Sequence, residues 1–260
     1  MSLWRKLALS VAAITISATP AIAQDAELTP KEIVEKSLDQ NGLGFYSGVA
    51  KLRITVVRGK KKDTNEMLVE SKEVEDDVAN TRVTILEPAD MAGEAYLFLG
   101  QTEREDDVYV YLPAFKTTRK VSGQDKKGAF LNTHMTYNDL ESRDVEDGEA
   151  KRLDDEKIGP YECFVIETTA KDGDDSDYGK VVTFVRKKDY MPLRIEFYDK
   201  KGELEKRIFS EKISKDGDTR YVKKMSIKPE AGGSTTIEVL EVDFGADLNS
   251  KIFSKDALGE

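Results

Sequence analysis

The chain has 260 residues, 39% of them apolar and 35% charged, and its 40 basic and 50 acidic side chains give a net charge of -10. This composition excludes collagen-like, disulfide-rich and low-complexity proteins. The acidic balance argues against a nucleic-acid partner, because phosphate binding needs an excess of Lys and Arg.

The N-terminal segment predicts a cleavable export signal. The basic pair Arg5-Lys6 precedes an apolar run over residues 7–18, and Ala21-Ile22-Ala23 is typical of a cleavage site. A retained membrane anchor is the alternative, but the run of about 12 residues is shorter than the ~20 that a spanning helix needs. We expect residues 1–23 to be removed and residues 24–260 to form one soluble extracytoplasmic domain, neither lipidated nor stably inserted in a membrane.

The mature segment begins with a predicted helix and continues with strands. Thr29-Pro30-Lys31-Glu32 is a capping box with proline at the first helical position, which predicts a helix from Pro30 to Gln40. Thereafter apolar and polar residues alternate in segments typical of half-buried antiparallel strands, among them 51–56, 82–85, 193–197 and 221–227. Turn signals at regular intervals favour a meander of about eleven strands that closes into a barrel or sandwich.

Three segments lack this alternation. Pro113–Leu140 is long and irregular, which predicts a functional loop or lid. Asp139–Lys157 is densely charged, which predicts a helical or irregular crossing. A short closing helix is expected near the C-terminus from four apolar residues, Leu248, Ile252, Phe253 and Leu258.

Catalytic patterns are weak. His134 is the only histidine, and no Gly-x-Ser-x-Gly or phosphate-cradling glycine motif accompanies it, so we interpret it as a loop residue. Cys163, the only cysteine, lies in an apolar stretch and is expected in the core. The acidic cluster Asp172, Asp174, Asp175 and Asp177 fails the calcium-loop pattern. We therefore predict no enzyme, no cofactor and no metal.

Two segments, Tyr96–Leu99 and Val108–Leu112, are apolar on both strand faces. An antiparallel strand needs one apolar face for the core, so a helix, a lid or a ligand must cover the second. The N-terminal helix is one such cover. A large curved sheet without catalytic groups is otherwise suited to hold an apolar ligand, at about 0.8 kcal/mol per buried methylene.

Three motifs resemble those of the outer-membrane lipoprotein-sorting proteins, the LolA-like family. They are Tyr111-Leu112-Pro113-Ala114, Thr118-Arg119-Lys120-Val121 and the run from Phe130 to Leu140, FLNTHMTYNDL. The run departs from the family at Asn132, where glycine is usual, and at His134, where aspartate is usual. Asparagine tolerates positive φ better than most residues, so we expect the turn to survive.

The resemblance implies an incomplete, half-open antiparallel β-barrel of about eleven strands, with a few helices over the open side of an apolar cavity. It also implies a periplasmic carrier that accepts lipid-modified protein from an inner-membrane transporter and passes it to an outer-membrane acceptor. On this hypothesis Arg119 contacts a head group or partner. Six residues are expected to line the cavity: Tyr96, Phe98, Tyr109, Tyr111, Phe130 and Met135.

Two other functions stay open. One is a sensor or adaptor subunit of a lipid-exporting efflux transporter that carries nothing, because the charged surface suits both roles. The other is an envelope hydrolase, for which substitution of His134 is a direct test.

Overall fold

In a computed structural model, the residues that the structure describes are 28–38, 47–75, 78–102, 104–140, 148–170 and 176–259. The predicted export signal, the end of the predicted helix at residues 39–40 and Asp172, Asp174 and Asp175 lie outside these ranges. Within them, thirteen antiparallel strands form one sheet.

The strands are β1 (Gly48–Arg58), β2 (Lys61–Glu75), β3 (Val78–Glu87), β4 (Ala95–Leu99), β5 (Asp107–Leu112), β6 (Thr117–Lys120), β7 (Gly148–Ile158), β8 (Tyr161–Ala170), β9 (Lys180–Arg186), β10 (Pro192–Tyr198), β11 (Leu204–Asp216), β12 (Thr219–Pro229) and β13 (Ser234–Asp243). The helices are α1 (Pro30–Leu38) and the 3-10 turns η1 (Asp125–Lys127), η2 (Phe130–Asn132), η3 (Asn138–Leu140), η5 (Ser250–Ile252) and η6 (Ala257–Gly259).

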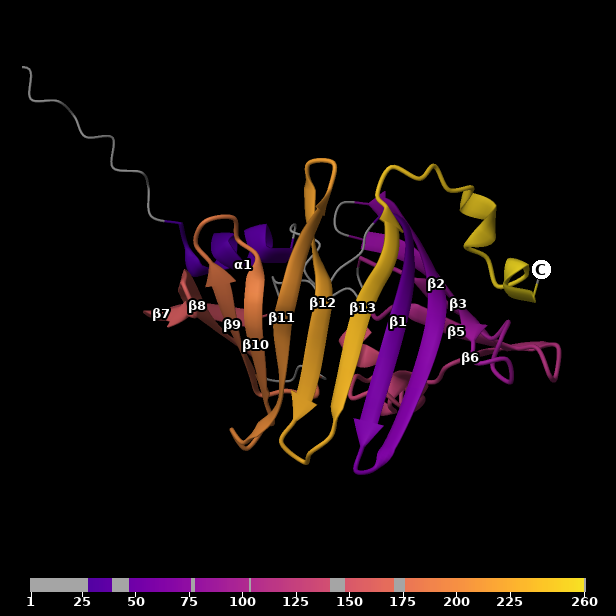
Figure 1. The fold of residues 1–260 in the computed structure, drawn as a ribbon, viewed down its shortest axis with the longest axis horizontal. Coiled ribbons are helices and arrows are strands. Elements are labelled where there is room, and N and C mark those ends of the chain that lie inside the picture. The colour runs from indigo at the N-terminus through magenta and orange to yellow at the C-terminus, as the bar shows by residue number, and fades with distance from the viewer. Residues whose placement is uncertain are drawn as a thin grey trace, which may run out of the picture.

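The sheet consists of two meanders, β1 to β6 and β7 to β13, which are joined where the first strand pairs with the last. Figure 1 shows β1 and β13 side by side at the centre, with β5 and β6 towards one end and β7 and β8 towards the other. β6 and β7 are both edges, so the sheet is curved but not closed. This confirms the predicted half-open, mainly β fold, with thirteen strands in place of about eleven.

The two additional strands lie in the segments without alternation. The predicted loop 113–140 contains β6, and the predicted helical or irregular crossing 139–157 is wrong from Gly148 onwards, where β7 begins. β7 is an edge strand whose residues are mostly exposed on both faces, so no buried position imposes a period of two. The predicted closing helix consists of the short 3-10 turns η5 and η6.

One continuous face of the sheet, here the inner face, is marked by cross-strand neighbours. Ile54 of β1 lies opposite Ile237 of β13, and Ile227, Ile208 and Ile195 are paired in turn across β12, β11 and β10. The segment 121–140, here the inner loop, covers this face at β1 to β5. The helix α1 covers it at the other end.

The helix α1 begins as the capping box predicts. The backbone N–H of Glu32 donates to Oγ1 of Thr29 (3.3 Å), and the N–H of Thr29 donates to the Glu32 carboxylate (2.7 Å). Ile33 is fully buried against Ile166 of β8 and Val185 of β9. The helix therefore lies far along the sheet from β4 and β5, and does not cover their second face.

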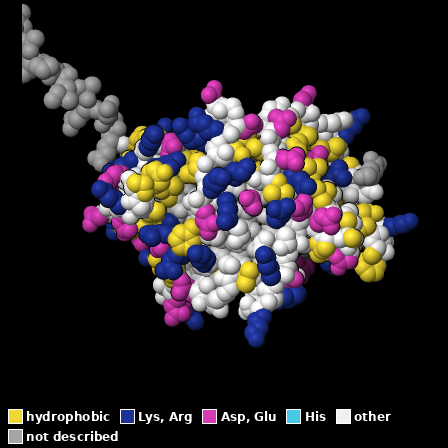
Figure 2. Space-filling view, viewed as in Figure 1, with side chains coloured by type: hydrophobic (Ala, Val, Ile, Leu, Met, Phe, Trp, Pro, Cys, Tyr) yellow, Lys and Arg dark blue, Asp and Glu magenta, His cyan; other side chains and the backbone are white. Residues whose placement is uncertain are grey.

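The opposite, outer face of β4 and β5 is covered by the C-terminal segment. Phe253 and Leu258 pack on Leu97, Tyr109 and Tyr111. This segment, which follows β13 in the chain, thus buries the second apolar face of β4 and β5. Elsewhere, Figure 2 shows acidic and basic side chains interspersed over the face in view.

Candidate functional site

An aromatic cluster lies on the inner face where the inner loop meets β4. The ring centroid of Phe130 lies 5.1 Å from that of Tyr96, 6.1 Å from that of Phe98 and 5.4 Å from that of Tyr137, all in edge-to-face geometry. Such pairs contribute about 0.5–1.5 kcal/mol each beyond the area they bury. Phe130 and Leu131 are buried against valines and isoleucines of β1 to β5.

A buried ion pair attaches the inner loop to the sheet. Nζ of Lys206, in β11, lies 2.5 Å from Oδ2 of Asp139, and the two side chains are 7% and 4% exposed. The hydroxyl of Tyr178 donates to Oδ1 of Asp139 (2.8 Å), and the backbone N–H of Thr136 donates to Oδ2 (2.7 Å). Both oxygens of this buried carboxylate therefore accept hydrogen bonds, as burial of a charge requires.

A second set of contacts holds the tip of the loop. The Arg58 guanidinium donates to the carbonyl oxygens of Asn132 (3.0 Å) and Thr133 (2.9 Å). Leu131 and Asn132 have φ values of 48° and 56°. The asparagine thus adopts the left-handed conformation for which glycine is usual, as its tolerance of positive φ predicts.

His134 is held inside the same tip. Its backbone N–H donates to Oγ1 of the fully buried Thr235 (3.0 Å), and Nδ1 lies 2.8 Å from the same oxygen. Nε2 is buried without a hydrogen-bond partner. Burial, and then the charges of Arg58 and Lys206, lower the pKa of His134. Within the described part of the chain no carboxylate orients this ring, so the arrangement is not that of a catalytic relay.

The structure divides the six predicted cavity residues among three places. Tyr96, Phe98 and Phe130 meet in the aromatic cluster. Met135 packs in an adjacent inner-face cluster around Ile208. Tyr109 and Tyr111 lie on the outer face beneath the C-terminal segment.

Arg119 lies at the β6 edge, on the same face as the aromatic cluster. It is exposed and is paired across β5 and β6 with the inner-face residue Val110. Burial is the first cause that raises the pKa of both Tyr96 and Tyr137, and the positive charge of Arg119 opposes this rise at each phenol. Arg119 therefore stands within electrostatic reach of the cluster.

Sequence reasoning missed Lys206, Asp139 and Tyr178. The sequence does indicate the direction of Lys206. It lies two residues before the inner-face residue Ile208 in the same strand, so both side chains point to the same face. An inward lysine in a β-strand is rare unless a partner neutralises it. The sequence alone does not say which of 50 acidic residues is that partner.

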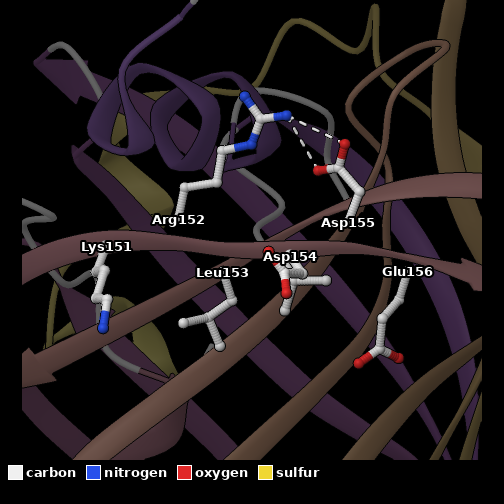
Figure 3. A pocket seen from close by; sticks show the side chains of 7 residues that line it. Lys151, Arg152, Leu153, Asp154, Asp155 and Glu156 are labelled. Atoms are coloured by element: carbon white, nitrogen blue, oxygen red, sulfur yellow. Dashed lines mark hydrogen bonds and ion pairs between the residues drawn. The ribbon is translucent and has the colours of Figure 1, made fainter.

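A separate open cavity of about 710 Å³ lies beside the edge strand β7. Its lining is mostly charged and consists of Lys151, Arg152, Leu153, Asp154, Asp155, Glu156 and Val165. Figure 3 shows Arg152 and Asp155, joined by hydrogen bonds, on one side of the strand and Lys151, Leu153 and Glu156 on the other. These residues differ from the predicted apolar lining.

The described residues were also compared with the requirements of a metal site and of a membrane-spanning helix. No three His, Cys, Asp or Glu side chains are placed to hold a metal ion among them. No helix within these ranges has the length and apolar character to cross a membrane. Cys163 is fully buried, and burial raises the pKa of its thiol, which confirms its place in the core.

The fold is similar to three solved structures over 88% of this chain in each case. A domain described as an outer membrane lipoprotein-sorting protein from Vibrio parahaemolyticus is 29% identical, with 98% of that chain covered and a TM-score of 0.80. A DUF1329 family protein from Desulfovibrio piger is 26% identical, with 97% covered and a TM-score of 0.82. A LolA superfamily protein from Nitrosomonas europaea, at 24% identity, 99% coverage and a TM-score of 0.69, shares the fold.

The described residues form an open antiparallel half-barrel with aromatic side chains on its inner face and a loop across that face. A family model whose description reads "-like: Uncharacterized protein" matches residues 77–260, more than half of the sequence. The chain belongs to this family, and its fold is that of the lipoprotein-sorting domain and of the LolA superfamily protein. No curated protein matches it in sequence.

Proposed function

We propose that the protein is a periplasmic carrier that binds acyl chains, of lipid or of lipid-modified protein, on the inner face and moves them towards the outer membrane. The observation that most supports this proposal is that the chain covers its own aromatic inner face with the inner loop. Its similarity to a domain described as a lipoprotein-sorting protein supports this role.

The inner loop is suited to exchange places with a ligand. Phe130 and Leu131 contribute apolar burial, at about 1.5–3 kcal/mol for each large side chain. An acyl chain that buries several methylenes, at about 0.8 kcal/mol each, offers the sheet comparable stabilisation. The buried pair between Lys206 and Asp139 attaches the end of the inner loop to β11. A ligand that replaces Phe130 and Leu131 would therefore displace the loop tip while the end of the loop stays attached to the sheet.

Native mass spectrometry of protein purified without detergent tests the proposal. We expect phospholipid or lipopeptide masses to remain bound. The substitution Phe98→Glu, on the inner face, should abolish binding of a fluorescent fatty-acid probe, because a carboxylate then faces the acyl chain. Tyr109→Glu, on the adjacent strand but the outer face, is the matched control and should retain binding. Equal binding by both folded variants would contradict the inner-face site.

The non-carrying adaptor of an envelope transporter is a second candidate. It is favoured by one observation, that Phe130 and Leu131 already fill the space in front of the aromatic cluster. An adaptor should show neither retained lipid nor probe binding, while a carrier should show both. The same mass spectra therefore separate the two functions.

A further inference from the structure

A row of inner-face residues changes from apolar to charged towards the β6 edge. Val69 of β2 lies opposite Val83, Val83 opposite Tyr96, Tyr96 opposite Val110, and Val110 opposite Arg119. The first four are buried and Arg119 is exposed. An amphipathic ligand that lies along this row would place its apolar part over β2 to β5 and its polar part at Arg119.

A negative charge, Glu94, accompanies Arg119 at this end of the row. We call Arg119, Glu94 and the phenols of Tyr96 and Tyr137 the rim. The hydroxyl of Tyr96 donates to Oε2 of Glu94 (3.1 Å). The charges of Glu94 and Arg119 act in opposite directions on the pKa of Tyr96 and on that of Tyr137, so both lie within electrostatic reach of the same two phenols. Burial raises the pKa of both phenols, so both hydroxyls stay protonated, and that of Tyr96 is the donor to Glu94.

Neither charge is neutralised by a neighbour. In the part of the chain that the structure describes, Arg119 and Glu94 form no ion pair, whereas Lys120, the next residue of β6, lies 2.5 Å from Asp107 on the other face. Asp125, which also faces Tyr137, accepts a hydrogen bond from the Ser122 hydroxyl (2.6 Å). The rim thus presents one unpaired cation and one unpaired anion beside two phenols.

We infer that this rim binds a zwitterionic phospholipid head group of the phosphoethanolamine kind, with its phosphate at Arg119 and its ammonium group at Glu94. Guanidinium groups bind phosphate oxygens through charge-assisted hydrogen bonds, and a carboxylate does the same for an ammonium group. The inference rests on the proposed carrier function and narrows its cargo. A lipid-modified protein lacks the phosphate, so it would leave Arg119 unused.

Competition against a fluorescent fatty-acid probe tests the head-group site. The competitors are dioctanoyl phosphatidylethanolamine, dioctanoyl phosphatidylglycerol and a triacylated lipopeptide without phosphate. We expect the wild type to prefer the ethanolamine lipid over the glycerol lipid by about tenfold, the value of one charged interaction. Arg119→Gln should weaken both lipids by about tenfold, with no effect on the lipopeptide.

Variants at Glu94 separate charge from structure. Glu94→Gln should weaken only the ethanolamine lipid and so remove the preference, while Glu94→Asp should retain it. Lys116→Gln, which removes an exposed cation from the turn of the same hairpin, is the matched control and should change nothing.

The outcomes distinguish this inference from the proposed function. If no competitor displaces the probe and no lipid is retained, the carrier function itself fails. If the lipids bind without preference, or if Arg119→Gln and Glu94→Gln leave affinities unchanged, the head-group site is overturned and the carrier stands. Tighter binding of the lipopeptide than of the ethanolamine lipid, insensitive to Arg119→Gln, also overturns it.

Discussion

At the scale of single residues, the inner loop depends on Lys206. Replacement by methionine, Lys206→Met, leaves the Asp139 carboxylate buried without its cation. Removal of one partner from a buried pair costs about 3–5 kcal/mol. We expect the free energy of unfolding in urea to fall by this amount.

Lys224→Met is the control for this substitution, because Lys224 pairs with Glu211 at the surface (3.2 Å, 41% and 36% exposed). Exposed pairs contribute about 0–1 kcal/mol. The double variant Lys206→Met/Asp139→Asn should recover part of the loss, since no buried charge remains. A loss at Lys206 no larger than that at Lys224 would show that the loop is not held by this pair.

His134 makes stability depend on pH in one direction. Its pKa is lowered in the folded protein, chiefly by burial and then by Arg58 and Lys206, so the unfolded chain binds the proton more tightly. The stabilisation is present above the usual histidine pKa of about 6.5 and is lost as pH falls through the folded value.

Urea unfolding measured from pH 7.5 to pH 5 checks this prediction. We expect the free energy of unfolding of the wild type to decline over this range and that of His134→Gln to be flatter. Below this window the carboxylates titrate in both proteins and the two curves should run together. Parallel curves from pH 7.5 downwards would exclude a role for the histidine.

At the scale of elements, α1 is predicted to be part of the folded unit and not a detached lid. Ile33 is fully buried between β8 and β9, so Ile33→Ala should reduce the free energy of unfolding by about 2–5 kcal/mol. Glu35→Ala, on an exposed position of the same helix, should change it by less than about 0.5 kcal/mol. Thermal unfolding followed by circular dichroism compares the two. A small effect of Ile33→Ala would indicate that α1 leaves the sheet easily.

Sequence patterns predict some elements better than others for a physical reason. β1 alternates because one face is buried, whereas β7 has the sequence GEAKRLDDEKI, is mostly exposed on both faces and carries a bulge between Leu153 and Glu156. For the candidate site, the apolar character of Tyr96 and Tyr109 was evident. Their opposite directions follow from the register between β4 and β5, in which Tyr96 lies opposite Val110, and alternation within one strand does not predict this register. Which face receives the inner loop likewise depends on contacts with residues far along the chain.

At the scale of the whole molecule, β7 is one edge of the sheet within the described residues, and we expect its charged side chains to prevent pairing with another chain. Charged side chains and bulges on an edge strand oppose pairing with another chain. The double variant Lys151→Thr/Asp154→Thr removes two exposed charges without changing the net charge, and should promote dimers or larger species. Size-exclusion chromatography with light scattering measures this.

The matched control removes an equal pair from the centre of the sheet. Lys51→Thr/Glu241→Thr acts on β1 and β13, which are already paired on both sides, so the protein should stay at the same mass as the wild type. If the edge variant also keeps the wild-type mass at high concentration, Lys151 and Asp154 do not prevent pairing at the edge strand β7.

The pairing of β1 with β13 has a consequence for how the molecule is made. This pairing joins the first strand of the sheet to the last, and contacts so distant in sequence form slowly. In a nascent polypeptide, which emerges N-terminus first, β1 therefore lacks β13 as a partner until the last strand has been synthesised. During that interval a holding chaperone has a long, unpaired backbone edge to recognise.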